Sequence, residues 1–211
     1  MKRVTLKMRK PCIVYWLENN LYLNITNKCP NNCYFCFRNF THGLRGFDLK
    51  LRQEPSSEEV ITELQKVVNK QDWDEIVFCG FGEPLERLDC VVRVTKWIKK
   101  HLWKAVRIDT NGQGFLLNKG RNVLEELKEA GVDKISVSLN AHDKNTYNRV
   151  CKPNFKDAYE SVLEFIEKAS KEFDLEITAV AIPEIDVSRI EEVAEKMRAK
   201  FRTRRFIPCF W

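Results

Sequence analysis

Short apolar runs alternate with amphipathic segments along the whole chain. Two of the runs, residues 12–17 and 21–26, flank an Asn-rich turn, a pattern that predicts a β-hairpin. Later runs predict strands at 75–79, 105–109, 134–139 and 175–182, with a last strand at 204–210. The intervening segments predict helices that begin after Ser56 or occupy 88–102, 123–130, 158–173 and 190–201.

Local signals and the order of the elements predict an α/β fold. Ser56 and Glu59 fit a capping box, and Gly131 stands where a helix-ending glycine is expected. Alternating strands and helices are typical of a parallel sheet. About six such units are too few for a closed barrel of about 250 residues. We therefore expect a partial, open (β/α)6 TIM-like barrel with an N-terminal β-hairpin, in a single domain spanning residues 1–211.

The composition narrows the class of protein. With 44% hydrophobic and 31% charged residues, it is that of a soluble globular protein. The apolar runs are too short to span a bilayer, and no long apolar stretch follows the basic start. We therefore expect a cytoplasmic protein with no membrane partner. The net charge of +6 is compatible with an anionic substrate, including nucleic acid, without requiring one.

Polar motifs stand where the predicted strands end. Ligands of parallel α/β sheets bind at the carboxyl ends of the strands, so these motifs predict one shared binding site. The alternative is structural, because Gly and Pro mark turns and Asp, Asn and Ser cap backbone groups. The motifs are a cysteine loop after 21–26, Gly82-Glu83-Pro84 after 75–79, Asp109 and Asn111 after 105–109, and Ser138 and Asn140 after 134–139.

The cysteine loop carries the most informative spacing. Cys29, Cys33 and Cys36 form a Cys-x3-Cys-x2-Cys pattern, and the Pro-Asn-Asn between the first two favours a tight turn. Such a loop can aim three thiolates at one point. Iron–sulfur clusters are normally held by four thiolates, so three would leave one iron open to another ligand.

Other residues have weaker predictions. The remaining cysteines are expected to be buried apolar thiols, with Cys79 of interest because it adjoins a strand-end motif. The basic segment 37–54, which includes His42, is expected either to cover the site and contact substrate or to be a solvated loop. The remaining cysteines are Cys12, Cys79, Cys90, Cys151 and Cys209.

The cysteine spacing, with Phe35 before the last cysteine, resembles the signature of the radical S-adenosylmethionine (radical SAM) superfamily. The resemblance implies that Cys29, Cys33 and Cys36 ligate a [4Fe–4S] cluster whose open iron chelates S-adenosylmethionine. It further implies reductive cleavage of that cofactor to methionine and a 5′-deoxyadenosyl radical, which abstracts hydrogen from a substrate.

The resemblance also assigns cofactor contacts. Gly82-Glu83-Pro84 is similar to the family's GGEP motif, with Phe81 in place of its first glycine, and implies that Glu83 holds the methionyl ammonium group. The other implied contacts are Asp109 and Asn111 near the sulfonium and ribose, Ser138 and Asn140 near the methionyl carboxylate or ribose, and Phe35 and Ile182 near the adenine.

Phrases along nearly the whole chain, among them FCGFGEPLERLD and ISVSLNAHDKNTYNRVCKP, resemble the TatD-associated radical SAM proteins. This implies a functional association with a TatD-type nuclease and a one-electron donor of the flavodoxin or ferredoxin type. The substrate stays open between a small anionic metabolite and a nucleotide or nucleic acid.

A non-enzymatic module that binds zinc or nucleic acid is the competing class. Structural zinc needs four Cys or His ligands, and His42 or Cys12 could supply the fourth. The sequence has no second closely spaced ligand pair, which disfavours zinc. Such a module would hold zinc and would not respond to S-adenosylmethionine.

Overall fold

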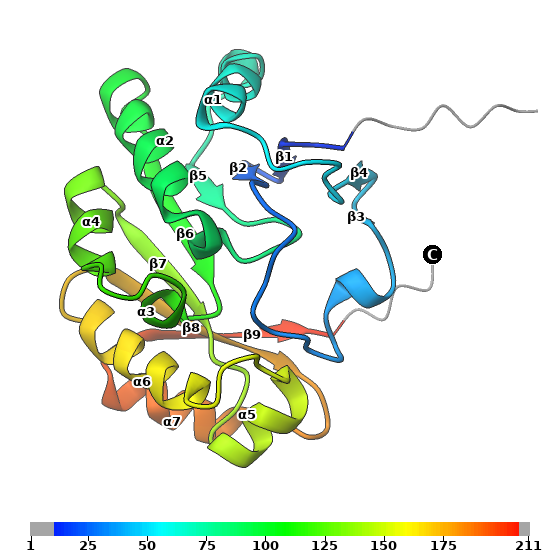
Figure 1. The fold of residues 1–211 in the computed structure, drawn as a ribbon, viewed down its shortest axis with the longest axis vertical. Coiled ribbons are helices and arrows are strands. Elements are labelled where there is room, and N and C mark those ends of the chain that lie inside the picture. The colour runs from blue at the N-terminus through cyan, green and yellow to red at the C-terminus, as the bar shows by residue number, and fades with distance from the viewer. Residues whose placement is uncertain (1–10, 207–211) are drawn as a thin grey trace, which may run out of the picture.

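The computed structural model describes residues 11–206, which form one seven-stranded sheet with helices along one side (Figure 1). The predicted hairpin is confirmed, because β1 (Val14–Leu17) pairs antiparallel with β2 (Asn20–Leu23). The remaining pairings are parallel, as predicted. The sheet order continues through β5 (Glu75–Phe78), β6 (Ala105–Thr110), β7 (Lys134–Ser138), β8 (Asp174–Ala181) and β9 (Lys200–Arg205).

The helices form an arc outside the curled sheet (Figure 1). The predicted helix starts and ends are largely confirmed: Ser56 and Glu59 exchange both hydrogen bonds of the capping box, and Gly131 ends its helix at φ +95°. The helices are α1 (Ser57–Gln65), α2 (Leu88–His101), α3 (Gly114–Leu117), α4 (Val123–Ala130), α5 (Lys144–Cys151), α6 (Ala158–Ala169) and α7 (Val187–Lys196).

Several parts of the structure differ from the sequence prediction. The helix α6 ends at Ala169 instead of residue 173, and α7 begins at Val187 instead of residue 190. The helices α3 and α5 were not expected, and segment 37–54 contains a small hairpin of β3 (Gly43–Leu44) and β4 (Phe47–Asp48). The last helix ends at Lys196 instead of residue 201, because Arg198 adopts a left-handed φ of 54°. The last strand consequently begins at Lys200, and the expected residues 207–210, with Cys209, lie outside the described range.

The two faces of the sheet have opposite character. In β6, Val106 and Ile108 are fully buried towards the helices, whereas Arg107 and Asp109 project from the other face. The cross-strand register continues this polar row, since Asp109 lies beside Ser136. We call this the inner face; its members include Tyr22, Arg107, Asp109, Ser136, Ser138, Glu176, Arg202 and Arg204.

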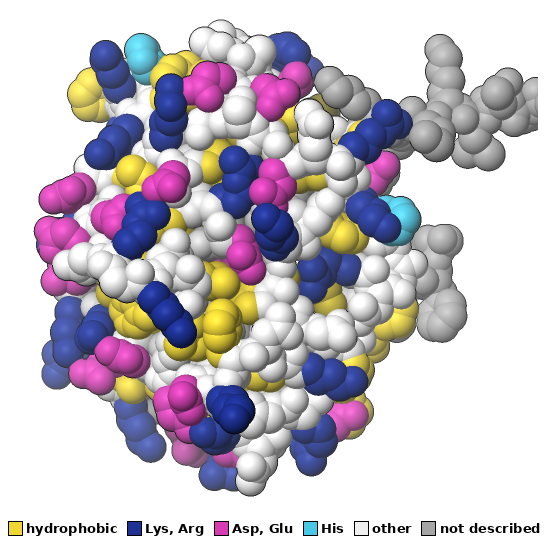
Figure 2. Space-filling model, in the orientation of Figure 1, with side chains coloured by type: hydrophobic (Ala, Val, Ile, Leu, Met, Phe, Trp, Pro, Cys, Tyr) yellow, Lys and Arg dark blue, Asp and Glu magenta, His cyan; other side chains and the backbone are white. Residues whose placement is uncertain are grey.

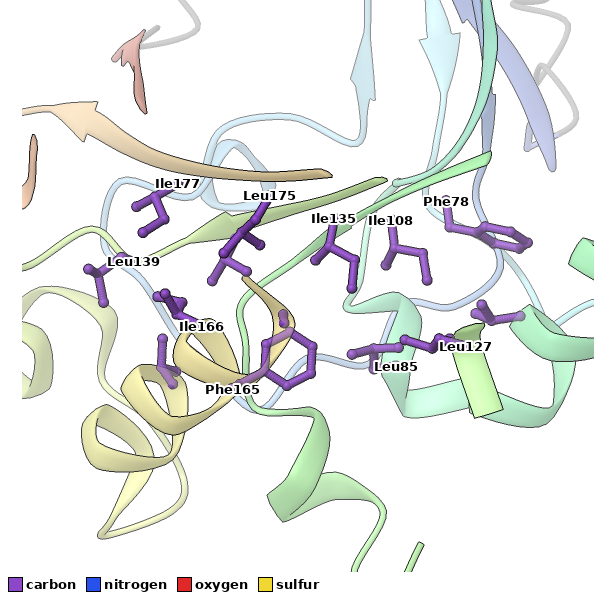
Figure 3. Packing of buried hydrophobic residues seen from close by; sticks show 14 of the residues in the cluster. Phe78, Leu85, Ile108, Leu127, Ile135, Leu139, Phe165, Ile166, Leu175 and Ile177 are labelled. Atoms are coloured by element: carbon purple, nitrogen blue, oxygen red, sulfur yellow. The ribbon is translucent and has the colours of Figure 1, made fainter. Parts of the chain in front are cut away.

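Apolar packing between the sheet and the helices forms the core. Figure 3 shows Ile108, Ile135 and Ile177 of three neighbouring strands facing Leu85 and Phe165 of the covering layer. Parallel sheets are usually apolar and covered on both faces, so a polar inner face is unusual and marks that face for ligand contact.

No helix within residues 11–206 has both the length and the apolar character needed to cross a membrane.

Replacing Phe165 with Ala tests this core. The side chain is fully buried and its ring lies 5.2 Å from that of Phe115, so the change should lower the free energy of unfolding by about 3–5 kcal/mol. Chemical denaturation of Phe165→Ala and of Phe40→Ala, whose side chain is 47% exposed, provides the comparison. Similar losses in the two variants would contradict the proposed core.

Candidate active site

The strand-end motifs meet at one edge of the sheet, as the sequence predicts. The backbone N–H of Glu83 donates to the carbonyl oxygen of Lys28 at 2.7 Å, which joins the GEP turn to the cysteine loop. The side-chain amide of Asn111 lies 3.7 Å from the Cys29 sulfur. A side chain at Gly82 would collide with the carbonyl oxygen of Lys28, at 2.3 Å, so only glycine permits this approach.

Arg38 holds the cysteine loop through hydrogen bonds to three residues of the loop. Its guanidinium donates to the Cys36 sulfur at 3.2 Å and to the carbonyl oxygens of Asn27 and Asn31 at 3.3 and 3.2 Å. The same charge favours thiolates nearby, although burial dominates at Cys29 and raises the pKa of its thiol to about 12. A bound cation at these sulfurs would reverse that effect, because a coordinating thiol is deprotonated outright.

Cys151, predicted to be a buried apolar thiol, is in contact with the loop. Its thiol hydrogen-bonds to Cys33, which lowers the pKa of Cys33 and raises that of Cys151. The backbone of this region also carries the loop, since the N–H of Asn32 donates to the carbonyl oxygen of Cys151 at 3.0 Å. This contact was not predictable from sequence, because Cys151 lies at the end of α5, a helix that was not predicted.

A buried polar network supports the cysteine loop from below. The side-chain amide of Gln113 donates to the Asn31 side-chain oxygen at 2.6 Å and to the Tyr147 hydroxyl at 3.0 Å. Asn31 in turn donates to Tyr147 at 3.2 Å. All three residues are almost completely buried, so the network fixes the loop relative to β6 and α5.

Glu83 is buried at the centre of the site, with 3% of its surface exposed. Its carboxylate accepts hydrogen bonds from Thr110 Oγ1 and the Asn111 N–H, both at 2.7 Å, and from the Leu85 N–H at 3.1 Å. Burial raises its pKa to about 7 despite these donors. The carboxylate therefore binds the strand-end loops together within the chain, a role that sequence reasoning did not assign to it.

Asp109 projects onto the inner face beside Arg107, with 3.0 Å between its Oδ1 and the Arg107 Nε. Burial raises the pKa of Asp109, and the thiol of Cys79 also hydrogen-bonds to it. Cys79 is thus a neighbour of the strand-end site instead of a plain core thiol. Ser138, the next predicted contact, accepts a hydrogen bond from Arg204 Nη2 at 2.9 Å.

The other predicted contacts have mainly structural partners in the described residues. Asn140 accepts a hydrogen bond from the Val180 N–H at 3.0 Å and so joins the ends of β7 and β8. Pro84 begins a short helical turn, while Phe35 and Ile182 belong to the hydrophobic core. His42 lies 3.4 Å from Lys50 Nζ, and its ring centroid is 6.4 Å from that of Phe81.

A cavity of about 300 Å³ adjoins the cysteine loop. Cys29, Arg38 and Phe81 line it, and the Phe81 side chain occupies the position where the family motif has glycine. The guanidinium of Arg38 lies over the Phe81 ring, 5.9 Å from its centroid. The departure from GGEP therefore adds an aromatic wall to the cavity.

The loop supplies the donor type of an iron–sulfur cluster. Its three cysteines are free, and cysteine thiolates hold such clusters. In a [4Fe–4S] cluster each cysteine binds a different iron, so three thiols leave the fourth iron open to another ligand. Among the described residues, no three Cys, His, Asp or Glu side chains converge tightly enough to hold one ion.

Comparisons with known proteins agree on one family. Residues 23–197 match the family described as the Radical SAM superfamily. The probable GTP 3′,8-cyclase of Methanocaldococcus jannaschii is 32% identical over 90% of this chain and 59% of that protein. Its counterpart in Thermoplasma volcanium is 24% identical over 83% of this chain and 49% of that protein. The chain therefore spans between about half and three fifths of these relatives' lengths.

Solved structures confirm the predicted fold. The FeFe-hydrogenase maturase HydG from Carboxydothermus hydrogenoformans superposes with a TM-score of 0.65 at 17% identity, over 90% of this chain and 44% of that one. Methylornithine synthase gives a TM-score of 0.62 at 17% identity, over 90% and 53%. At such low identity the likeness concerns the fold alone, an open and curled half-barrel.

The carboxyl of Glu83 makes stability depend on pH. Its pKa rises from 4.5 in the unfolded chain to about 7, so folding favours the protonated form. The free energy of unfolding should therefore fall by about 3 kcal/mol between pH 4.5 and 7, and Glu83→Gln should remove that fall. Urea denaturation across this range, with the exposed Glu125→Gln as control, measures the difference. A fall of the same size in Glu83→Gln would show that another group causes it.

Proposed function

The chain belongs to the radical SAM superfamily, and on that premise we propose that it is an enzyme that cleaves S-adenosylmethionine reductively. Members of this superfamily use a [4Fe–4S] cluster and S-adenosylmethionine. In the proposed enzyme, Cys29, Cys33 and Cys36 hold the cluster. The observation that carries the proposal is the loop of exactly these three thiols beside a cavity at the strand ends.

When bound, the reduced cluster supplies the electron that splits the sulfonium into methionine and a 5′-deoxyadenosyl radical, which takes hydrogen from the substrate. The residues of the chain position the cluster and the cofactor. Arg38 keeps the sulfurs in place through its hydrogen bonds to the loop. Glu83, whose carboxylate already organises the strand ends, offers its remaining acceptor capacity to the methionyl ammonium group.

We assign the remaining contacts to S-adenosylmethionine to residues at or near the strand ends. Asp109 and Asn111 orient the sulfonium and ribose, and Ser138 and Asn140 meet the carboxylate or ribose. Gly82 and Pro84 shape the turn that lets backbone approach the cofactor. Phe35 and Ile182, both in the hydrophobic core, would pack near the adenine.

For the substrate we propose a small anionic metabolite or a nucleotide. The relatives named as probable GTP 3′,8-cyclases support the nucleotide, and Arg204 of the inner face, whose Nε is buried without an acceptor, supports an anion in general. Basic and acidic side chains are interspersed on the face shown in Figure 2, with no extended basic surface there for a nucleic acid. A nucleic acid is therefore the weaker candidate.

The proposed cellular setting follows from the sequence resemblance. A flavodoxin- or ferredoxin-type protein would supply the electron, and the enzyme would work in the cytoplasm. The likeness to TatD-associated members points to a functional link with a TatD-type nuclease. This link would be consistent with a nucleotide substrate.

Anaerobic reconstitution tests the proposal. The protein is purified, supplied with iron and sulfide, reduced and mixed with S-adenosylmethionine, and 5′-deoxyadenosine is measured. We expect a brown protein that forms 5′-deoxyadenosine, and we expect Cys33→Ala to lose it by at least about 100-fold because one cluster ligand is missing. Cys90→Ala, a buried thiol in α2 outside the loop, should retain the activity.

The competing class predicts different results. A zinc- or nucleic-acid-binding module would remain colourless, hold zinc and leave S-adenosylmethionine intact. In that case Cys33→Ala should unfold the protein, as measured by circular dichroism. A folded but silent Cys33→Ala protein supports the enzyme, whereas a zinc-loaded wild type with no cluster would overturn it.

A further inference from the structure

The inner face of the sheet carries three arginines near the site, and two of them are neutralised by carboxylates. Arg107 lies 3.1 Å from Glu75 Oε1 and also pairs with Asp109. Arg202 makes two hydrogen bonds to Glu176, at 2.9 and 2.7 Å. Such paired fork geometry satisfies both the charge and the donors of the guanidinium.

Arg204 is the exception. Its Nη2 donates to the neutral hydroxyl of Ser138 at 2.9 Å, and its Nε is buried without an acceptor. Within residues 11–206, no carboxylate lies at ion-pair distance from it, although its neighbours in β6 and β9 are paired. Burial accordingly lowers the pKa of Arg204. The charge of Asp109 acts on it from beyond that distance, but Asp109 is already paired with Arg107. A partly buried cation without a close counter-charge is costly unless an anion joins it.

The position of Arg204 relates it to the candidate active site. In the β8–β9 register it stands beside Val180, near the carboxyl end of the sheet, and Ser138 ends β7. Its charge acts on the thiols of Cys33 and Cys79. Arg204 is therefore directed at the region between the cysteine loop and the inner face.

We propose that Arg204, together with the hydroxyl of Ser138, binds the carboxylate or phosphate of a ligand held against the inner face. The inference rests on the proposed function, because it places that ligand in the same site. Two ligands carry such a group: S-adenosylmethionine through its methionyl carboxylate, and an anionic substrate through a carboxylate or phosphate. The guanidinium fork suits either group.

Two matched ligand pairs separate these sources. One pair is S-adenosylmethionine and decarboxylated S-adenosylmethionine, and the other is GTP and guanosine. Dissociation constants are measured by isothermal titration calorimetry on the anaerobic, reconstituted protein without reductant, so that no turnover occurs. The wild type is compared with Arg204→Gln, with Arg204→Lys, and with Arg205→Gln, whose side chain follows in the same strand and is exposed.

We expect Arg204→Gln to weaken, by about 10- to 100-fold, the member of one pair that carries the carboxylate or the phosphates, while leaving the counterpart that lacks this group unchanged. Arg204→Lys should recover part of the loss, and Arg205→Gln should match the wild type. A loss confined to S-adenosylmethionine identifies the methionyl carboxylate as the bound group. A loss confined to GTP identifies the substrate phosphate.

Thermal unfolding distinguishes a ligand-binding role from a structural one. If Arg204 binds a ligand, Arg204→Gln should melt at or above the wild-type temperature without ligand, and the anion should no longer raise it. Equal affinities in wild type and Arg204→Gln for both S-adenosylmethionine and GTP, or a melting temperature lowered by several degrees, would overturn the proposal. The GTP pair requires no cluster, so a failure to form the cluster would contradict the proposed function and leave this arm intact.

Discussion

The buried carboxylate of Glu83 is the interaction on which the arrangement of the site depends. It accepts hydrogen bonds from Thr110 and Asn111 after β6, while its own N–H is bound to Lys28 beside the first cysteine. Three segments that are far apart in the sequence are thereby held at one point. Because a buried carboxylate without donors would be costly, the loops and Glu83 stabilise one another. The carboxylate of Glu83 can bind a cationic ligand only while it is ionised. The geometry of the site is therefore coupled to the charge of Glu83.

The one-sided sheet gives this edge its chemistry. Helices cover a mainly apolar face, while the opposite face keeps alternate polar side chains from every central strand. Paired charges such as Arg202 and Glu176 keep that face soluble and ordered without a second layer of helices. The surplus charge of Arg204 stands out against this background. In the proposed enzyme, the half-barrel holds the cofactor at its strand ends and leaves its inner face for a second ligand.

Much of this architecture follows from local patterns in the sequence. Apolar runs and the Ser56–Glu59 cap predict the positions of the strands and the first helix, and strand-end placement predicts that Glu83, Asn111 and Cys29 come together. Contacts between distant segments were not predictable. The hydrogen bond between Cys151 and Cys33 depends on where α5 packs, and the network around Gln113 depends on how three loops close over it. Polar residues inside otherwise apolar strands, such as Arg107, mark the inner face of the sheet. The prediction used only the positions of the apolar runs and therefore missed this face.

In the proposed enzyme, three cysteines leave one iron of the cluster open to S-adenosylmethionine. Electron paramagnetic resonance of the reduced, reconstituted protein can detect this open iron, with spectra recorded before and after S-adenosylmethionine is added. We expect a reduced [4Fe–4S] signal whose g-values shift when S-adenosylmethionine coordinates the open iron. A cluster signal that S-adenosylmethionine leaves unchanged, or a protein that forms no cluster at all, would contradict it.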